Sequence, residues 1–305
     1  MKNLILLLIL LVFGSSAFSQ NDSITVVVPG FTNDQTVLDD FTKKAIALYE
    51  ADNYKGMYDM VEYKKFKKTT LVDYKEGSRK RKGGIDIENL KAGNLILGKL
   101  YLCGQCPNLH LTTATGFVIN ADGTCVTNNH VFNEFSKDNP TYYLSVFAMD
   151  HEGNVYPIKE VLAANKDHDL AVFKIETDKP LTPLTLGERA EVGSNIHLLS
   201  HPDRMYYTYT KGYITRSYLN GTTKSPRHSI SADFAKGSSG APIFNDKEEV
   251  IGVVSSTRTI KYSSSGNTQM VVKEIIPIEL LKEMCSNEAS FNREKRGVPG
   301  GFPSF

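Results

Sequence analysis

Three short segments of the chain carry a histidine, an aspartate and a serine in that order. They are residues 127–131 around His130, 167–172 around Asp169 and 237–242 around Ser239. A serine hydroxyl is a poor nucleophile near neutral pH, so it needs a neighbouring base, and that base needs a third group to orient it. His130 can take the proton of Ser239 while Asp169 orients the imidazole. The three segments therefore predict a hydrolase with a serine nucleophile.

The residues around Ser239 suit a tight turn that exposes a hydroxyl group. Gly237 and Gly240 leave the backbone free to adopt such a turn, and Pro242 prevents it from continuing as a helix. We expect the backbone N–H groups of Gly237 and Ser239 to form an oxyanion hole. A glycine- and serine-rich segment alone is equally compatible with an ordinary turn, so this prediction depends on the other two segments.

The aspartate of the predicted triad has a rival nearby. Asp169 directly precedes the apolar run 170–173, where a positively charged His130 would keep its carboxylate ionised. Asp167 lies two residues earlier, further from that run, and suits a turn. The sequence therefore favours Asp169.

The elements around these segments read mainly as β-strands. About ten short apolar runs lie between residues 95 and 273, bounded by Gly, Asn, Asp, Pro and Ser, which indicates a closed all-β architecture. Apolar residues at helical spacing predict helices over 36–49 and 57–63, and Pro277 begins a further helical pattern that runs to Met284.

In this order and with these flanks, the segments resemble the chymotrypsin-fold serine endopeptidases, especially the bacterial trypsin-like and HtrA-type enzymes. The resemblance covers about residues 95–285 and rests on four motifs: Thr115–Ile119 with Val126–Val131, Asp169–Ile175, Gly237–Phe244 and Val250–Val253. It implies two packed six-stranded antiparallel β-barrels with the triad in the cleft between them. A C-terminal helix and a small α-rich N-terminal segment complete the expected fold.

The predicted organisation has four parts. Residues 1–19 read as a signal peptide, because an apolar core of about ten residues is too short to span a bilayer and small residues follow it. Residues 20–91 form the α-rich segment, 92–286 the protease domain and 287–305 a disordered tail. Too few residues follow the last helix for a PDZ domain.

Nine basic residues lie between Lys64 and Lys82, within the α-rich segment. A solvated linker explains them most simply. A processing site that separates a pro-segment from the protease domain, and a contact with an anionic surface, are the alternatives.

Two residues depart from the pattern of the animal digestive enzymes. Ser238 stands where those enzymes carry an aspartate that pairs with a newly cut N-terminus, so this route of activation is not expected here. Ala241 replaces the second glycine of the usual motif after the nucleophile.

The substrate preference is less readable. The resemblance places Asp233 near the base of the primary specificity pocket, which would favour Arg or Lys in the substrate, whereas a turn or support role is the alternative. Lys236, beside the site, could instead favour an acidic side chain.

Four cysteines offer further chemistry. Cys103 and Cys106 are close enough for a local disulfide, and a metal half-site that includes His110, or free thiols, are the alternatives. Cys125 and Cys285 are expected singly, in a strand and a helix.

A net charge of +1 argues against a dedicated nucleic-acid binder. We expect an exported, periplasmic or secreted enzyme that cleaves polypeptides through an acyl-enzyme and needs no cofactor or metal. No integral membrane segment is expected after signal removal, and the sequence leaves the oligomeric state open. The alternative is a catalytically weak protein of the same fold that binds unfolded chains or a partner.

Overall fold

The computed structural model describes residues 30–51, 68–77, 84–133, 142–263 and 266–286. The described residues from Thr32 onward belong to one compact unit. The predicted signal peptide, the helix over 57–63 and the tail over 287–305 lie outside the described residues, as do the basic residues 79–82.

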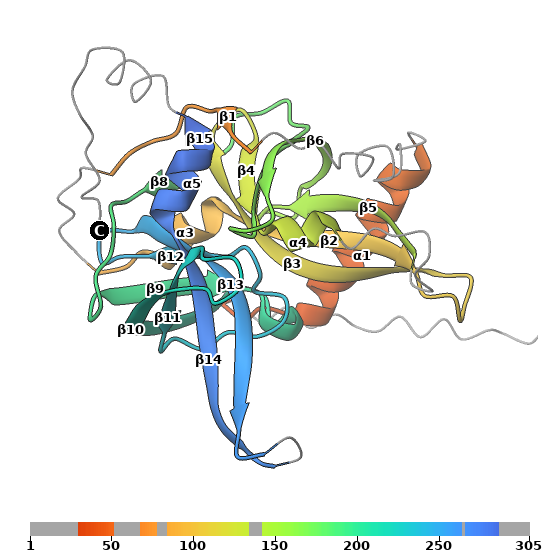
Figure 1. Cartoon of the computed structure of the whole chain (residues 1–305). Coiled ribbons are helices and arrows are strands. Elements are labelled where there is room, and N and C mark those ends of the chain that lie inside the picture. Colours follow the sequence, from red (N-terminus) through yellow and green to blue (C-terminus); the bar gives the residue numbers. More distant parts are fainter. Residues whose placement is uncertain (1–29, 52–67, 78–83, 134–141, 264–265, 287–305) are drawn as a thin grey trace, which may run out of the picture. The chain divides into compact units, whose positions relative to one another are not determined.

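The first barrel is a closed ring of six strands in the order β2-β3-β4-β7-β6-β5, and each neighbouring pair is antiparallel (Figure 1). Its strands are β2 (Asn94–Leu102), β3 (Leu109–Asn120), β4 (Thr124–Thr127), β5 (Tyr142–Met149), β6 (Val155–Asn165) and β7 (Leu170–Ile175). The sequence pattern missed β6, because a proline and charged side chains interrupt its apolar residues.

The second barrel closes through β12-β9-β10-β11-β14-β13, since β12 also pairs with β13. Its strands are β9 (Asn195–Ser200), β10 (Thr208–Leu219), β11 (Pro226–Ile230), β12 (Pro242–Phe244), β13 (Glu249–Lys261) and β14 (Thr268–Pro277). The short β8 (Thr185–Leu186) adds to β13 in parallel. Figure 1 shows β13 and β14 projecting from this barrel as a long hairpin. The prediction of two six-stranded antiparallel barrels is confirmed.

Helices cover the ends and one side of the barrels. They are α1 (Asp34–Ala51), α3 (Ile87–Ala92), α4 (Asn129–Asn133) and α5 (Ile278–Met284), with a 3₁₀ turn over Pro202–Arg204. The helices predicted over 36–49 and 277–284 correspond to α1 and α5. The expectation that Cys285 lies in a helix is wrong, because α5 ends at Met284 and Cys285 begins β15 (Cys285–Ser286), which pairs with β1 (Thr70–Leu71). None of the described helices combines the length and the apolar character that a membrane span requires.

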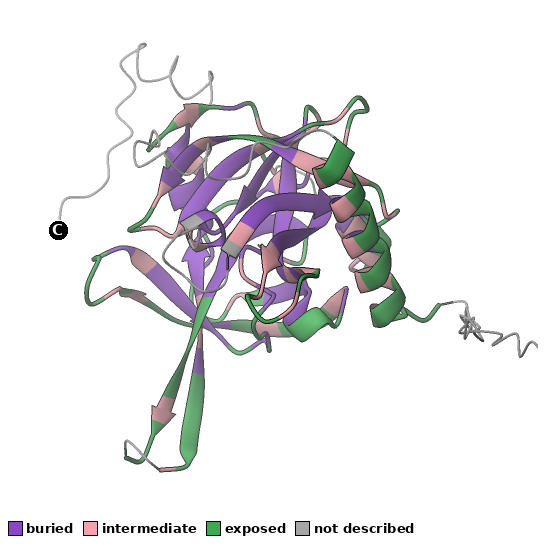
Figure 2. Ribbon diagram, turned by 90° about the vertical axis from the view of Figure 1, so that its right-hand side faces the viewer, coloured by how far each residue is buried: buried purple, intermediate pink, exposed green. Residues whose placement is uncertain are grey.

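Helix α1 packs on the outside of the first barrel. Side chains alternate between the two faces of a strand, and β2 uses both faces for burial. Leu95 and Leu97 pack into the barrel interior, whereas Ile96 and Leu100 pack with Phe41 of α1. Figure 2 shows the outcome as a buried strand layer beneath a long helix whose outer face is exposed. Residues 94–100 are therefore all buried, because the barrel interior covers one face of β2 and α1 covers the other.

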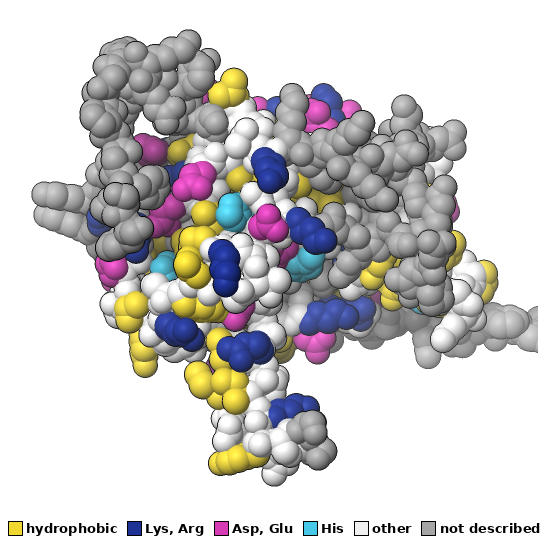
Figure 3. All heavy atoms as spheres, in the orientation of Figure 1, with side chains coloured by type: hydrophobic (Ala, Val, Ile, Leu, Met, Phe, Trp, Pro, Cys, Tyr) yellow, Lys and Arg dark blue, Asp and Glu magenta, His cyan; other side chains and the backbone are white. Residues whose placement is uncertain are grey.

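Charged side chains of both signs are interspersed on the face drawn in Figure 3. This distribution agrees with the formal net charge of +1. The described side chains on this face form no field of a single sign, which is what a surface built to bind nucleic acid would present.

A buried hydrogen-bonded pair joins the two barrels. The Nδ1 atom of His201 accepts a bond from the Tyr207 N–H at 3.1 Å, so Nε2 carries the proton and donates it to Asn94 Oδ1 at 3.0 Å. Asn94 in turn donates through Nδ2 to the Leu199 carbonyl at 2.9 Å. His201 is fully buried, and burial lowers its pKa from 6.5 to about 3.

His201 makes the stability of the fold depend on pH. In the unfolded chain its imidazole binds a proton below pH 6.5, whereas in the folded protein it stays neutral down to about pH 3. The free energy of unfolding therefore falls as the pH falls below 6.5. We expect His201→Gln to lower that free energy by about 1–3 kcal/mol at pH 7.5, and the difference from wild type to shrink between pH 7.5 and 5. Urea unfolding at each pH measures it.

The control is His151→Gln, at an exposed turn, which should follow the wild-type curve at every pH. A His201 variant whose difference from wild type stays constant over this range would contradict the assignment.

Candidate active site

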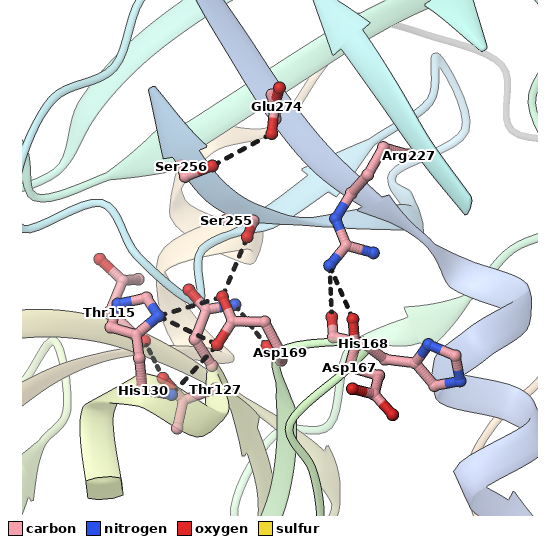
Figure 4. Close-up of polar contacts among 11 residues, drawn as sticks. Thr115, Thr127, His130, Asp167, His168, Asp169, Arg227, Ser255, Ser256 and Glu274 are labelled. Atoms are coloured by element: carbon pink, nitrogen blue, oxygen red, sulfur yellow. Dashed lines mark hydrogen bonds and ion pairs between the residues drawn. The ribbon is translucent and has the colours of Figure 1, made fainter. Parts of the chain in front are cut away.

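His130 and Asp169 contact each other directly. Strands β4 and β7 pair with Thr127 opposite Ala171, so the residues that follow β4 lie beside those that precede β7. His130 Nδ1 lies 3.0 Å from both carboxylate oxygens of Asp169, and the His130 backbone N–H donates to Oδ1 at 3.1 Å (Figure 4). This contact leaves Nε2 as the ring nitrogen that is not engaged with the carboxylate.

Asp169 is held by contacts from three directions. Its backbone is in the left-handed region, with φ of 58°, a conformation that an L-residue adopts only when its surroundings hold it. Asn128 Nδ2 donates to its carbonyl oxygen at 3.0 Å, and Ser255 Oγ from β13 donates to Oδ2 at 2.9 Å. The carboxylate is therefore fixed by His130 in one barrel and Ser255 in the other.

A buried arginine supports the same loop. Arg227 of β11 is 5% exposed, and its Nη2 donates at 3.2 Å to the carbonyl oxygens of Asp167 and His168 (Figure 4). Its positive charge also interacts with Asp169. The side chain of Asp167 is exposed. The structure thus places Asp169, and not its rival Asp167, against His130.

The turn of Ser239 is bound to the first barrel through Thr115. The Thr115 N–H donates to the Ser239 carbonyl at 2.9 Å, and Thr115 Oγ1 donates to the Gly237 carbonyl at 2.8 Å. The Thr127 hydroxyl then donates to the Thr115 carbonyl at 2.8 Å. The strand ends that lead to His130 are thereby connected to the segment that carries Ser239, whose side chain is half-buried.

The glycines of this turn are required by its geometry. Gly237 and Gly240 have φ of 100° and 85°. A Cβ atom at Gly237 would meet the His201 carbonyl oxygen, and one at Gly240 would meet the Thr115 carbonyl oxygen and the Thr127 hydroxyl. Only glycine fits both the conformation and the space.

The backbone donors of the turn are available to a ligand. Within the described part of the chain, the N–H groups of Gly237 and Ser239 donate to no acceptor, whereas those of Ser238 and Ala241 bond to backbone carbonyls at 3.0 Å. The side chain of Ser238 is fully buried and donates to Ser200 Oγ at 3.0 Å. The pair formed by Ser238 and Ser200 is neutral, whereas the digestive enzymes form a charged pair at the position of Ser238.

Asp233 has an exposed carboxylate. Its side chain is 84% exposed and pairs with Lys273 of β14 at 2.6 Å, while its carbonyl oxygen accepts a bond from the Thr210 hydroxyl. These contacts favour the support role over a place at the base of a pocket. Lys236 is also exposed, and its carbonyl oxygen accepts a bond from the Asp203 N–H.

The Cys103 and Cys106 side chains are free thiols, with sulfur atoms 3.5 Å apart. His110 Nε2 lies 3.0 Å from Cys106 Sγ. Bonds from the Gln105 backbone and the Cys106 side chain lower the pKa of Cys103 to about 7. The proposed disulfide is thus not formed in this structure, and the thiols gather with His110.

Sequence reasoning missed several residues that build the site. Thr115 and Asn128 lie inside the segments that we singled out, but residue type alone gives them no role. Ser255 ends a predicted apolar strand, and a hydroxyl after a run of buried residues is the one signal that could have drawn attention to it. Arg227 carried no signal, because its partners are backbone carbonyls 59 and 60 residues away.

Comparison with known proteins agrees with this geometry. Residues 114–253 match the trypsin-like peptidase domain family. Together with the two barrels, this match makes the chain similar to the chymotrypsin-fold serine proteases over residues 114–253.

Two of the relatives that the chain matches are named as proteases. The chain is 30% identical over 193 residues to a probable periplasmic serine endoprotease DegP-like of Hahella chejuensis, covering 62% of this chain and 38% of that protein. It is 31% identical over 179 residues to the chloroplastic Protease Do-like 5 of Arabidopsis thaliana, covering 55% and 54%. The chain thus spans about a third to a half of the length of these relatives.

A solved structure shares the fold. The HtrA-type protease AlgW with a tripeptide superposes with a TM-score of 0.51 at 20% identity, covering 65% of this chain and 62% of that one. This likeness supports the fold of two barrels.

The contact between Gly240 and the first barrel can be tested by adding one methyl group. We expect Gly240→Ala to lower the free energy of unfolding by more than about 1 kcal/mol, because the new Cβ is strained at positive φ and meets Thr115 and Thr127. Gly221→Ala is the matched control, since nothing lies within 4 Å of a Cβ there. Equal stability of the two variants in urea would contradict this role for the glycine.

Proposed function

We propose that the chain is an exported serine endopeptidase that cleaves peptide bonds through an acyl-enzyme. The observation that carries this proposal is the bond between His130 and Asp169, formed next to a turn in which Ser239 is held by Thr115. His130 is the base, Asp169 orients it and Ser239 is the nucleophile.

The proposed reaction begins with the imidazole of His130. Its Nδ1–H donates to Asp169, so Nε2 is free to take the proton of Ser239 as the hydroxyl attacks the peptide carbonyl. The negative charge that develops on the carbonyl oxygen is held by the N–H groups of Gly237 and Ser239, and each such donor is worth about 3 kcal/mol in the transition state. His130 then returns the proton to the leaving amine.

The acyl-enzyme is released by the same groups. Water replaces the amine, His130 Nε2 accepts a proton from it, and the resulting tetrahedral intermediate again places its charge on the two N–H groups. Collapse of this intermediate frees the carboxylic acid and returns the proton to Ser239. No step uses a cofactor.

Peptide is the proposed substrate, and the protein is proposed to act outside the cytoplasm. AlgW is an HtrA-type protease solved with a tripeptide, and a relative is named as a periplasmic protease. The periplasmic location in the name of that relative agrees with the predicted signal peptide over residues 1–19. Intact mass of the exported protein tests this part of the proposal, since a chain that begins at Gln20 is expected.

A fluorophosphonate probe tests the nucleophile, because it reacts only with a serine that an adjacent base activates. We expect the wild-type chain to be labelled at one site and Ser239→Ala to lose the label. Ser263→Ala, in an exposed turn, is the matched control and should label like wild type. A wild-type chain that takes no label while it binds unfolded polypeptide would support the catalytically weak alternative.

Asp169 and Asp167 can be separated by one substitution each. Asp169→Asn should lower kcat on an unfolded polypeptide by about 10⁴-fold, because an amide stabilises the wrong tautomer of His130. Asp167→Asn should leave kcat unchanged, since its exposed side chain does not contact His130. Release of labelled peptides from an unfolded protein measures both rates. Similar losses in the two variants would contradict the assignment of Asp169.

A further inference from the structure

Three side chains that could bind a metal meet at the tip of the β2–β3 hairpin. Cys103 Sγ and Cys106 Sγ are 3.5 Å apart, and His110 Nε2 is 3.0 Å from Cys106 Sγ. All three atoms lie within 4.8 Å of one another. The proposed catalytic mechanism uses none of them.

We propose that Cys103, Cys106 and His110 bind one thiophilic divalent cation, with Zn²⁺ as the ion that fits them. Two thiolates and an imidazole are a preferred donor set for zinc. Tetrahedral bonds of normal length would separate the ligand atoms by about 3.6–3.8 Å. The sulfur atoms, 3.5 Å apart, lie close to this separation, whereas Cys106 Sγ and His110 Nε2, 3.0 Å apart, must move apart by about 0.6 Å to make room for the ion.

The turn between the cysteines is shaped for such a site. Gly104 has φ of 72°, which reverses the chain so that both sulfur atoms lie on the same side as His110. The loop thus brings the three ligand atoms together, and the cysteines would bind a metal as thiolates.

The imidazole is also held in place by its strand neighbours. Tyr101 lies opposite His110 in the β2–β3 pairing, and their ring centroids are 5.4 Å apart. His110 and Tyr101 line a cavity of about 370 Å³ between the hairpin and α1. Both cysteines are partly exposed. The partial exposure of both cysteines leaves room for water as a fourth ligand.

A disulfide is the competing use of the two sulfur atoms. It would employ two of the three groups and leave His110 with no part in the site, whereas a metal employs all three. The two states exclude each other, because sulfurs bonded to one another cannot bind a metal as thiolates.

Cobalt provides the test, because Co²⁺ bound by thiolates in a tetrahedral site has a sulfur-to-metal charge-transfer band and strong visible absorption. Titration of Co²⁺ into the purified, reduced chain should give this spectrum with a 1:1 end point, and Zn²⁺ should abolish it. Cys106→Ser and His110→Gln should each weaken binding more than about 100-fold, since even changes to groups behind the ligands cost 10- to 100-fold.

Cys285→Ala and His151→Gln are the matched controls and should bind Co²⁺ like wild type. A reduced chain that gives no cobalt spectrum, or ligand variants that bind as the controls do, would overturn the proposal. So would complete oxidation of Cys103 and Cys106 to a disulfide, seen as a mass loss of two hydrogens, in the presence of equimolar Zn²⁺. Circular dichroism checks folding of each variant. The metal titration needs no proteolytic activity, so its result stands apart from that of the probe experiment.

Discussion

Thr115 joins the two barrels at the point where the proposed nucleophile lies. Its backbone N–H and its hydroxyl bond to the carbonyls of Ser239 and Gly237, and its own carbonyl accepts a bond from Thr127. These bonds restrict the peptide units 237–238 and 239–240, and so limit the conformations of the neighbouring units that carry the N–H groups of Gly237 and Ser239. The orientation of the two free N–H groups thus follows from a contact between a strand and a turn that are far apart in the sequence.

Charge in the site is concentrated on the Asp169 carboxylate and the Arg227 guanidinium behind its loop, and neutral groups hold the turn of Ser239. Asp169 receives bonds from His130 and Ser255, and the buried Arg227 lies behind its loop. The turn of Ser239 is held by hydroxyls and backbone groups, with Ser238 bonded to Ser200. Bonds between neutral groups carry a small desolvation cost compared with a buried ion pair. This part of the site therefore needs no additional charge to form.

The sequence predicted most of the strands and the contact between His130 and Asp169, because both leave local patterns. A buried strand such as 170–175 is an apolar run, and the turn of Ser239 shows its glycines. The sequence predicted the supporting residues poorly, because Thr115 and Arg227 act on groups more than fifty residues away. Strand β6 was missed for a related reason: its pairing with β5 and β7 overrides a weak local pattern.

Helix α1 packs against β2, so a cut in the chain between them would not by itself release the helix. Phe41 and Ala45 are fully buried against the barrel, and Lys44 donates to the Gly153 carbonyl at 2.9 Å. Cleavage of the connecting segment would therefore yield a nicked, two-chain molecule rather than a shortened one. The helical fragment would stay bound through these apolar contacts and the bond from Lys44, and its loss would uncover Ile96 and Leu100. These exposed apolar side chains would favour association with other apolar surfaces, and the bound helical fragment prevents this by covering them.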